Sequence, residues 1–135
     1  MLTKLKINNY ALIDSLEISF NEGMTSITGE TGAGKSIILG GLSMVLGSRV
    51  DNSKIINKEK KCFVEATFDL TDIYLRDYFR KNDLDYDEIT IIRREVNQNG
   101  KSRAFINDTP VKLDQLSGLT NRLIDVHSQF NNLSI

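Results

Sequence analysis

The sequence of 135 residues contains one proline, one cysteine, one histidine and no tryptophan. A single Cys62 excludes an internal disulfide and a cysteine-based zinc cluster, and it suits a reducing compartment. No apolar run approaches the roughly 20 residues that span a bilayer, and the charged, alternating start does not resemble a signal peptide. Basic and acidic residues number 17 and 18, which excludes a strongly basic nucleic-acid-binding module. These absences predict a soluble, cytoplasmic domain with no membrane partner.

The spacing of apolar residues predicts one domain over residues 1–135, with no internal repeat or linker. Alternating patterns predict strands at about 2–8, 15–20, 24–28, 62–70, 89–96, 103–107 and 122–127. Helical spacing predicts helices at about 35–46, 71–80 and 113–119, and Gly47 is the expected stop of the first one. The Asn-Gly pair in 97–100 predicts a hairpin between the two strands that flank it. This order favours an α/β or α+β class with a mixed β-sheet.

One segment carries a specific chemical motif. Residues 29–36 match the phosphate-binding pattern G-x-x-x-x-G-K-[ST] in full and read Gly29-Glu30-Thr31-Gly32-Ala33-Gly34-Lys35-Ser36. The glycines let successive N–H groups approach an anion at the positive end of the following helix. Lys35 would reach the β- and γ-phosphates, and the Ser36 hydroxyl would ligate Mg²⁺. A purely structural glycine-rich turn is the alternative, but the strand pattern before the motif and the helix pattern after it favour nucleotide binding.

The remaining motifs narrow the choice of nucleotide. The nearest match to the guanine-reading N-K-x-D pattern is 57–60, which ends in Lys60 instead of Asp, and no D-x-x-G occurs, so GTP is disfavoured. A complete ATPase also needs an acidic Mg²⁺ ligand at the end of a buried strand. Asp125 follows an apolar run of only two residues, so it is better interpreted as an ordinary strand-end residue. The chain is therefore predicted to bind nucleotide without the whole hydrolytic machinery.

Several segments together resemble the RecN family of bacterial DNA-repair proteins. These segments are Leu5-Lys6-Ile7-Asn8-Asn9-Tyr10-Ala11-Leu12-Ile13, residues 23–36, Leu46-Gly47-Ser48-Arg49-Val50-Asp51, residues 100–107 and Ile124-Asp125-Val126-His127-Ser128-Gln129. Proteins of this family are SMC-like ATPases whose ABC-type head is split by a long antiparallel coiled coil. The resemblance implies a P-loop NTPase fold in which residues 1–135 are the N-terminal lobe of the head. The signature motif and the acidic Mg²⁺ strand would then lie beyond the coiled coil.

The resemblance also implies cofactors, partners and one further site residue. Gly29 to Ser36 would form the ATP loop, and Gln129 would help Ser36 to hold Mg²⁺ and would orient the attacking water. The sequence departs from the family around Gln129, where Ser128 replaces a glycine and 130–132 replace His-rich residues. The expected partners are the C-terminal lobe of the same head, a second head in a homodimer, and DNA bound by the full protein. The expected role is recombinational repair of DNA double-strand breaks, in the cytoplasm and at the nucleoid.

Two other functions stay open at this stage: a RecF-type recombination mediator, which shares the head without the long coiled coil, and a non-catalytic nucleotide-binding regulatory module. Arg49 is a candidate contact to phosphate or to the partner head, against a solvated loop arginine. Alternation sends Arg93 and Arg94 to opposite faces of a strand, so they cannot form one DNA-binding patch with Lys101 and Arg103. Residues expected to be structural or solvated are His127, Cys62, Lys58, Lys60 and Lys61.

Overall fold

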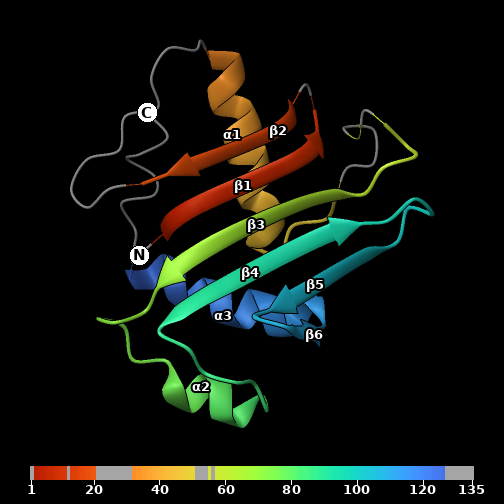
Figure 1. Ribbon diagram of the computed structural model, residues 1–135. Helices are drawn as coiled ribbons and strands as arrows, with labels where there is room; N and C mark the ends of the chain where they lie inside the picture. Colours follow the sequence, from red (N-terminus) through yellow and green to blue (C-terminus); the bar gives the residue numbers. More distant parts are fainter. Residues whose placement is uncertain (1, 12, 21–31, 51–54, 56, 127–135) are drawn as a thin grey trace.

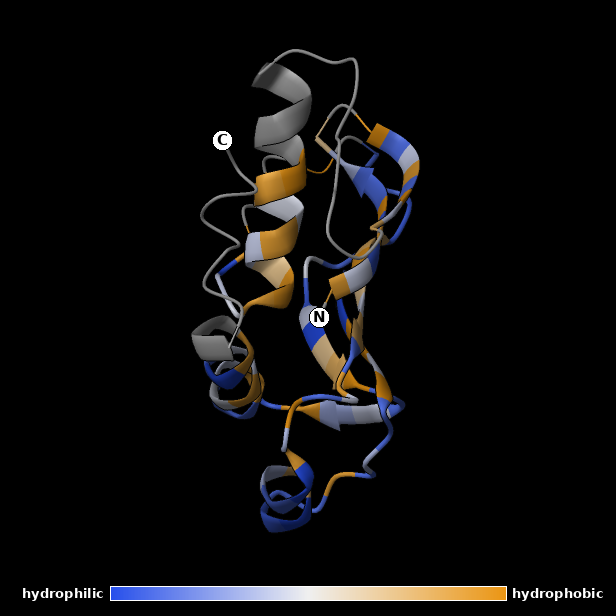
Figure 2. Ribbon diagram, turned by 90° about the vertical axis from the view of Figure 1, so that its left-hand side faces the viewer, coloured by the Kyte–Doolittle hydropathy of each residue, from blue (hydrophilic) through white to orange (hydrophobic). Residues whose placement is uncertain are grey.

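A computed structural model describes residues 2–11, 13–20, 32–50, 55 and 57–126, with only the backbone of 32–37 and 124–126. In this part of the chain, six strands form one sheet in the order β2-β1-β3-β4-β5-β6, and every neighbouring pair is antiparallel. Helices α1 and α3 lie on the same side of that sheet (Figures 1 and 2). The strand predicted at 24–28, which would make the sheet mixed, lies outside the described residues.

The strands predicted at 2–8, 15–20, 62–70, 89–96 and 103–107 are found near the predicted bounds, whereas the second and third helices differ from the prediction. The strands are β1 (Leu2–Tyr10), β2 (Ile13–Ser19), β3 (Cys62–Asp69), β4 (Ile89–Val96), β5 (Ser102–Ile106) and β6 (Thr109–Val111). The helices are α1 (Gly32–Val45), α2 (Arg76–Lys81) and α3 (Leu113–Val126). None of the described helices has the length and apolar character needed to cross a membrane.

The core lies between the sheet and the two helices on its covered side. Alternation along β3 buries Cys62 and every second residue after it, and the residues between them stay half-exposed. A sheet with one packed and one solvated face produces this period of two. The core residues with no exposed surface include Leu5, Ile7, Val64, Ala66, Phe68, Ile92, Leu116, Leu119 and Leu123.

The predicted hairpin between β4 and β5 is confirmed, and the structure adds a second one. The Asn97 side chain accepts hydrogen bonds from the backbone N–H groups of Asn99 and Lys101 within the first turn. Beyond β5, Ile106 pairs with Thr109, so the two residues between them turn the chain into β6. Strand β6 was not predicted, because Pro110 lies in its centre and proline is tolerated only at the edge of a sheet.

The prediction of a short helix followed by a strand at 122–127 was wrong. Helix α3 continues without interruption through Val126, since Leu116, Leu119 and Leu123 form a buried stripe at helical spacing. The pair Leu123-Ile124 is apolar enough to suggest a strand when it is considered alone. Asp125 therefore lies in the last turn of a helix, and its interpretation as a strand-end residue was wrong as well.

The start of the second helix also differs from the prediction. The Asp69 carboxylate accepts hydrogen bonds from both the backbone N–H and the hydroxyl of Thr71. These bonds lower the pKa of Asp69 and make a local turn, which competes with helix initiation at Thr71. Helix α2 consequently begins only at Arg76, and Leu75 precedes it without a side-chain cap.

Candidate nucleotide-binding site

The phosphate-binding motif leads directly into α1. The backbone of its last five residues, Gly32 to Ser36, forms the start of this helix, while Gly29, Glu30 and Thr31 lie outside the described residues. No acidic residue occurs in the first turn of the helix. The free N–H groups and the positive end of the helix dipole therefore meet no competing carboxylate in that turn, which suits a bound anion such as a phosphate.

Helix α1 packs closely on the sheet. A Cβ atom on Gly41 would lie 2.8 Å from Ile7 Cδ1, so a larger residue at this position would require the buried Ile7 side chain to move. Ile38, Met44 and Val45 are buried on the same side of the helix. The position of the N-terminal end of α1 is therefore fixed by packing along most of the helix.

The C-terminal end of α1 is formed as predicted. Gly47 has a φ of 104°, the Gly47 N–H donates to Met44 O, and the Ser48 N–H donates to Ser43 O. This pair of bonds is the Schellman arrangement, which requires a left-handed residue and favours glycine. The prediction that Gly47 ends the helix is confirmed.

The second predicted element of the site, Gln129, lies outside the described residues, as does His127. The chain approaches both from the end of α3 at Val126. The strand predicted at 122–127, just before Gln129, was wrong because the residues up to Val126 are helical. The assignment of Gln129 itself stays a prediction.

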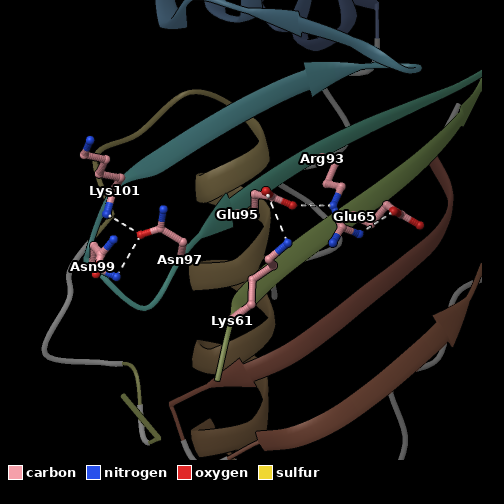
Figure 3. Close-up of polar contacts among 7 residues, drawn as sticks. All are labelled: Lys61, Glu65, Arg93, Glu95, Asn97, Asn99 and Lys101. Carbon is pink, nitrogen blue, oxygen red and sulfur yellow. Dashed lines mark hydrogen bonds and ion pairs between the residues drawn. The ribbon is translucent and has the colours of Figure 1, made fainter. Parts of the chain in front are cut away.

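Arg93 and Arg94 point to opposite faces of β4, as predicted. Arg93 Nη1 lies 2.9 Å from Glu65 Oε2, and Arg93 Nε lies 3.0 Å from Glu95 Oε2. Lys61 Nζ lies 3.6 Å from Glu95 Oε1, and Figure 3 shows these side chains on β3, on β4 and on the residue just before β3. The Arg93 guanidinium also stacks on the Phe63 ring, at 4.1 Å from the centroid. Two carboxylates thus neutralise this cluster, which disfavours it as a phosphate-binding patch.

Arg94 is only 1% exposed and faces the helices. Its Nη1 donates to Met44 O at 2.7 Å and to Ser48 O at 2.8 Å, and its Nη2 donates to Ser102 Oγ at 2.8 Å. From α3, the buried Thr120 donates its hydroxyl to Leu46 O at 3.1 Å. Sequence reasoning placed Arg94 on the face opposite Arg93 but missed that this face is the core, and it missed Thr120 entirely.

The other candidates are as exposed or as buried as predicted. Arg49 is exposed just after α1, and Lys58, Lys60 and Lys61 are exposed in the loop before β3. Cys62 has no exposed surface, and burial raises the pKa of its thiol to about 11. Asn9 was not predicted to matter, yet its buried amide bonds Asn57 and Lys60 and so ties this loop to β1. The φ of Asn9 is 56°, a left-handed conformation that asparagine tolerates better than most residues.

A metal site built from protein carboxylates, histidine or cysteine is not found in the described part of the chain, which has no group of three or more such residues. The predicted Mg²⁺ ligands are of another kind, namely the Ser36 hydroxyl and the Gln129 amide. Oxygen donors of this type, together with phosphate oxygens and water, are those that Mg²⁺ prefers.

Comparison with known proteins adds a family and two groups of relatives. The family model described as AAA domain matches residues 4–135. The DNA repair protein RecN of Vibrio cholerae is 44% identical over 130 residues, which cover 96% of this chain and 24% of that protein. RecN of Bacillus subtilis is 35% identical over 134 residues, which cover 98% of this chain and 23% of that protein. The chain thus spans about a quarter of the length of these relatives and corresponds to the N-terminal region of RecN.

Solved structures of similar fold include SMC proteins and a recombination mediator. A chain from a study of ATP-driven dimerization and DNA-stimulated activation of SMC ATPases has a TM-score of 0.70 and 21% identity, over 91% of this chain and 79% of that chain. The SMC head domain of Thermotoga maritima gives 0.64 and 21%, over 87% and 41%. The recombination mediator RecF, in a structure with ATP, gives 0.59 and 19%, over 82% and 27%. These likenesses concern the fold alone, and they confirm the predicted class, an SMC-type N-terminal lobe of a P-loop NTPase.

Proposed function

This chain belongs to the AAA domain family, and we propose that it is the ATP-binding N-terminal lobe of the head of a RecN-like, SMC-type ATPase acting in recombinational repair of DNA double-strand breaks. The observation that carries the proposal is the complete phosphate-binding motif at the start of α1, on a sheet with the topology of SMC heads. The 44% identity to RecN over 96% of the chain supports the same family of activities.

In this proposal, the backbone of Gly29 to Ser36 wraps the phosphates of ATP, and Lys35 neutralises the β- and γ-phosphates. The start of α1 fits this role, since its first turn carries small residues and no carboxylate. The Ser36 hydroxyl and the Gln129 amide oxygen hold Mg²⁺, which when bound offsets the negative charge of the phosphates. The Gln129 amide also orients the attacking water, because an amide both donates and accepts hydrogen bonds.

The rest of the catalytic machinery comes from outside this chain. The chain spans about a quarter of its relatives, so the remaining three quarters would supply the C-terminal lobe with its acidic residue and signature motif. ATP would bridge two heads of a homodimer, and hydrolysis would release them. DNA would bind the full protein, in the cytoplasm and at the nucleoid. The 135-residue lobe alone would bind ATP and not hydrolyse it.

Replacement of the motif lysine tests the nucleotide site. Lys35→Ala should remove measurable Mg·ATP binding in calorimetry while the circular dichroism spectrum and the melting temperature stay unchanged. Lys101→Ala is the matched control, because Lys101 is an exposed lysine in the β4–β5 turn. Wild-type ATP affinity in the Lys35→Ala variant would exclude the phosphate-loop assignment.

Replacement of Gln129 tests the proposed catalytic role separately. In the full-length protein, Gln129→Ala should keep the affinity for ATP within a few-fold, and it should lower turnover at least about tenfold, which is roughly 1.4 kcal/mol of barrier. Turnover should fall more than affinity because Gln129 acts only when metal and γ-phosphate are both in place. Unchanged turnover would make Gln129 a surface residue without a catalytic role.

A RecF-type recombination mediator is the second candidate, and the fold similarity to RecF at a TM-score of 0.59 favours it. The two functions predict different sequences after Ile135. A RecN-like protein would continue into a long heptad repeat, whereas a RecF-type protein would continue with head sequence. Reading the following 250 or so codons of the gene decides between them.

A further inference from the structure

Strand β6 covers only one end of β5. Strand β5 runs from Ser102 to Ile106, and β6 pairs with it only between Ala104 and Ile106. Because β6 is the last strand of the sheet, the start of β5 lies at the sheet edge in the part of the chain that the structure describes. Figure 1 shows this arrangement, with β6 beside the end of β5 and no strand on the outer side of its start.

The backbone of Ser102 faces this uncovered side. Two bonds fix the orientation of β5: the Asn107 N–H donates to Ile91 O at 2.7 Å, and the Asn97 N–H donates to Lys101 O at 3.0 Å. Residues 101 and 107 therefore point their backbone groups toward β4. Since this direction alternates along a strand, residues 102, 104 and 106 point away from β4. The last two of these meet β6, whereas the Ser102 N–H and C=O meet no strand among the described residues.

Helix α3 accounts for the shortness of β6. Leu113 would lie opposite Ser102 if β6 continued, but it is the first residue of α3 instead. The Lys112 N–H donates to Gln115 Oε1 at 3.1 Å, and Lys112 O accepts a bond from the Leu116 N–H at 3.0 Å. The first of these is the capping bond in which the third residue of a helix reaches back to the N-cap N–H. Capping of α3 thus turns the chain away from β5.

The space beside the start of β5 is a hollow of about 620 Å³, which is within the usual size of ligand sites. Its wall is mainly apolar, and Leu113 within it is 41% exposed. The two charged residues that line it, Arg103 and Lys112, are exposed and form no ion pair with a described carboxylate. No acidic side chain lines the hollow within the described ranges. We call this hollow the edge groove; its lining residues include Ser102, Arg103, Val111, Lys112 and Leu113.

The two faces of β5 determine which side chains a further strand would need in the edge groove. Ser102 lies on the covered face, where its hydroxyl accepts a bond from Arg94 Nη2, and Arg103 lies on the open face. If a strand continued the line of β6, its residue opposite Ser102 would lie near Val111 and Leu113, where an apolar side chain fits. Its residue opposite Arg103 would lie beside the guanidinium, where a carboxylate fits.

We propose that the edge groove binds an extended segment of a partner protein, in which acidic and apolar residues alternate and which adds to the sheet antiparallel to β5. Strand addition of this kind takes affinity from main-chain hydrogen bonds and specificity from alternate side chains. DNA would meet the same cations, but it would leave the Ser102 backbone groups and the apolar wall without a partner. The proposal does not depend on ATP hydrolysis, so its test is independent of the proposed function.

Binding of a designed peptide to the full-length protein is the first test. The probe is a short fluorescein-labelled peptide of alternating valine and aspartate, followed by fluorescence anisotropy. Saturable binding is expected, and a peptide with lysine in place of aspartate should not bind, because Arg103 and Lys112 repel it. Absence of saturable binding at about 1 mM peptide, or equal affinity for both peptides, would overturn the proposal.

Substitutions in the edge groove locate the binding site. Arg103→Ala should raise Kd about fivefold or more, whereas Arg80→Ala, which removes an exposed arginine of α2, should leave Kd unchanged. Leu113→Ala should raise Kd about threefold, and Leu39→Ala is its matched control, since both leucines are 41% exposed. Equal Kd values in each variant and its control, at unchanged melting temperatures, would place the peptide elsewhere and overturn the proposal.

N-methylated peptides test the strand pairing itself. The valines lie opposite Ser102 in this arrangement, so their N–H groups point at β5, while the N–H groups of the aspartates point to solvent. Methylation of the valine nitrogens should weaken binding about tenfold or more, and methylation of the aspartate nitrogens should weaken it less than about threefold. Equal effects of the two modifications would overturn strand addition. Displacement by a DNA duplex, together with insensitivity to methylation, would assign the edge groove to nucleic acid and overturn the proposal as well.

Discussion

Two neighbouring arginines on β4 experience opposite surroundings. Arg93 lies on the face of the sheet without helices, bonded to two carboxylates, and its side chain keeps 27% of its surface exposed. Arg94 lies on the face that α1 and α3 cover and is 1% exposed; its partners among the described residues are two carbonyls and a hydroxyl. Figure 2 shows these two sides of the sheet, one covered by helices and the other open.

The difference shows how one residue type serves two physical purposes. On the open face, water screens the ion pairs of Arg93, so each pair contributes little to stability. On the covered face, the guanidinium of Arg94 adds a donor to the carbonyl groups of Met44 and Ser48 at the end of α1. The covered face therefore specifies geometry, and the open face mainly keeps charges neutralised and the sheet surface polar.

Replacing each arginine by methionine should give the largest difference between the two faces. Arg94→Met removes the side-chain donor to the carbonyls of Met44 and Ser48 and to Ser102 Oγ, and should lower the free energy of unfolding by about 3 kcal/mol. Arg93→Met removes screened ion pairs and should lower it by less than about 1 kcal/mol. Urea denaturation of the 135-residue chain measures both values. Equal losses in the two variants would show that the covered face has no special role.

Cys62 gives a pH-dependent probe of the covered face. Burial raises the pKa of its thiol from 9.0 to about 11, so between these values the thiol ionises in the unfolded chain before it does in the folded one. The contribution to stability is complete below pH 9 and is lost as the pH rises toward 11, by roughly 2 kcal/mol. Unfolding free energies at pH 8, 9 and 10 should fall more steeply for the wild type than for Cys62→Ala. Parallel slopes would contradict a buried thiol.

The pair of Arg93 and Glu65 should give the smallest effect. A double-mutant cycle with Arg93→Met and Glu65→Gln is expected to yield a coupling of about 0.5 kcal/mol, because both groups are partly exposed. Since salt screens such pairs, the coupling should shrink further in 1 M sodium chloride. A coupling of about 3 kcal/mol, as large as the loss expected for Arg94→Met, that does not change with salt would mean that the open face is covered in solution.

Periodic features of the fold could be predicted from the sequence, and so could features that depend on one special residue. Strand β3, predicted at 62–70 and found at Cys62–Asp69, could be predicted because apolar and polar residues alternate along it without a break. Gly47 and the Asn-Gly turn were predicted because few residues accept a left-handed conformation. The alternation of Arg93 and Arg94 followed from strand geometry alone.

The errors have physical causes as well. A run of two apolar residues, Leu123-Ile124, fits a strand or a helix, and only packing of α3 as a whole decides between them. The side chain of Asp69 competes for the N–H of Thr71, a local effect that helical periodicity does not report. Burial of Arg94 contradicts the usual exposure of arginine, and it becomes intelligible only with the end of α1 beside it.

The phosphate-binding part of the candidate site could be predicted because the motif from Gly29 to Ser36 has the required residue types at the required spacing. Its continuation into α1 confirms the local structure that such a motif requires, over the residues that the structure describes. The strand predicted at 122–127, before Gln129, was wrong, because the residues up to Val126 belong to helix α3. Thr120 carries no sequence signal at all, since a threonine within a helix has no distinctive pattern.

The central claim is that this chain is one lobe of an ATPase head, which binds ATP and lacks the groups that hydrolyse it. ATP turnover by the purified 135-residue chain and by the full-length protein, measured side by side, tests this claim most directly. The account predicts saturable Mg·ATP binding with background turnover for the chain, and turnover that depends on Lys35 for the full-length protein. Steady hydrolysis by the isolated chain, abolished by Lys35→Ala, would contradict it by showing a complete active site within these residues.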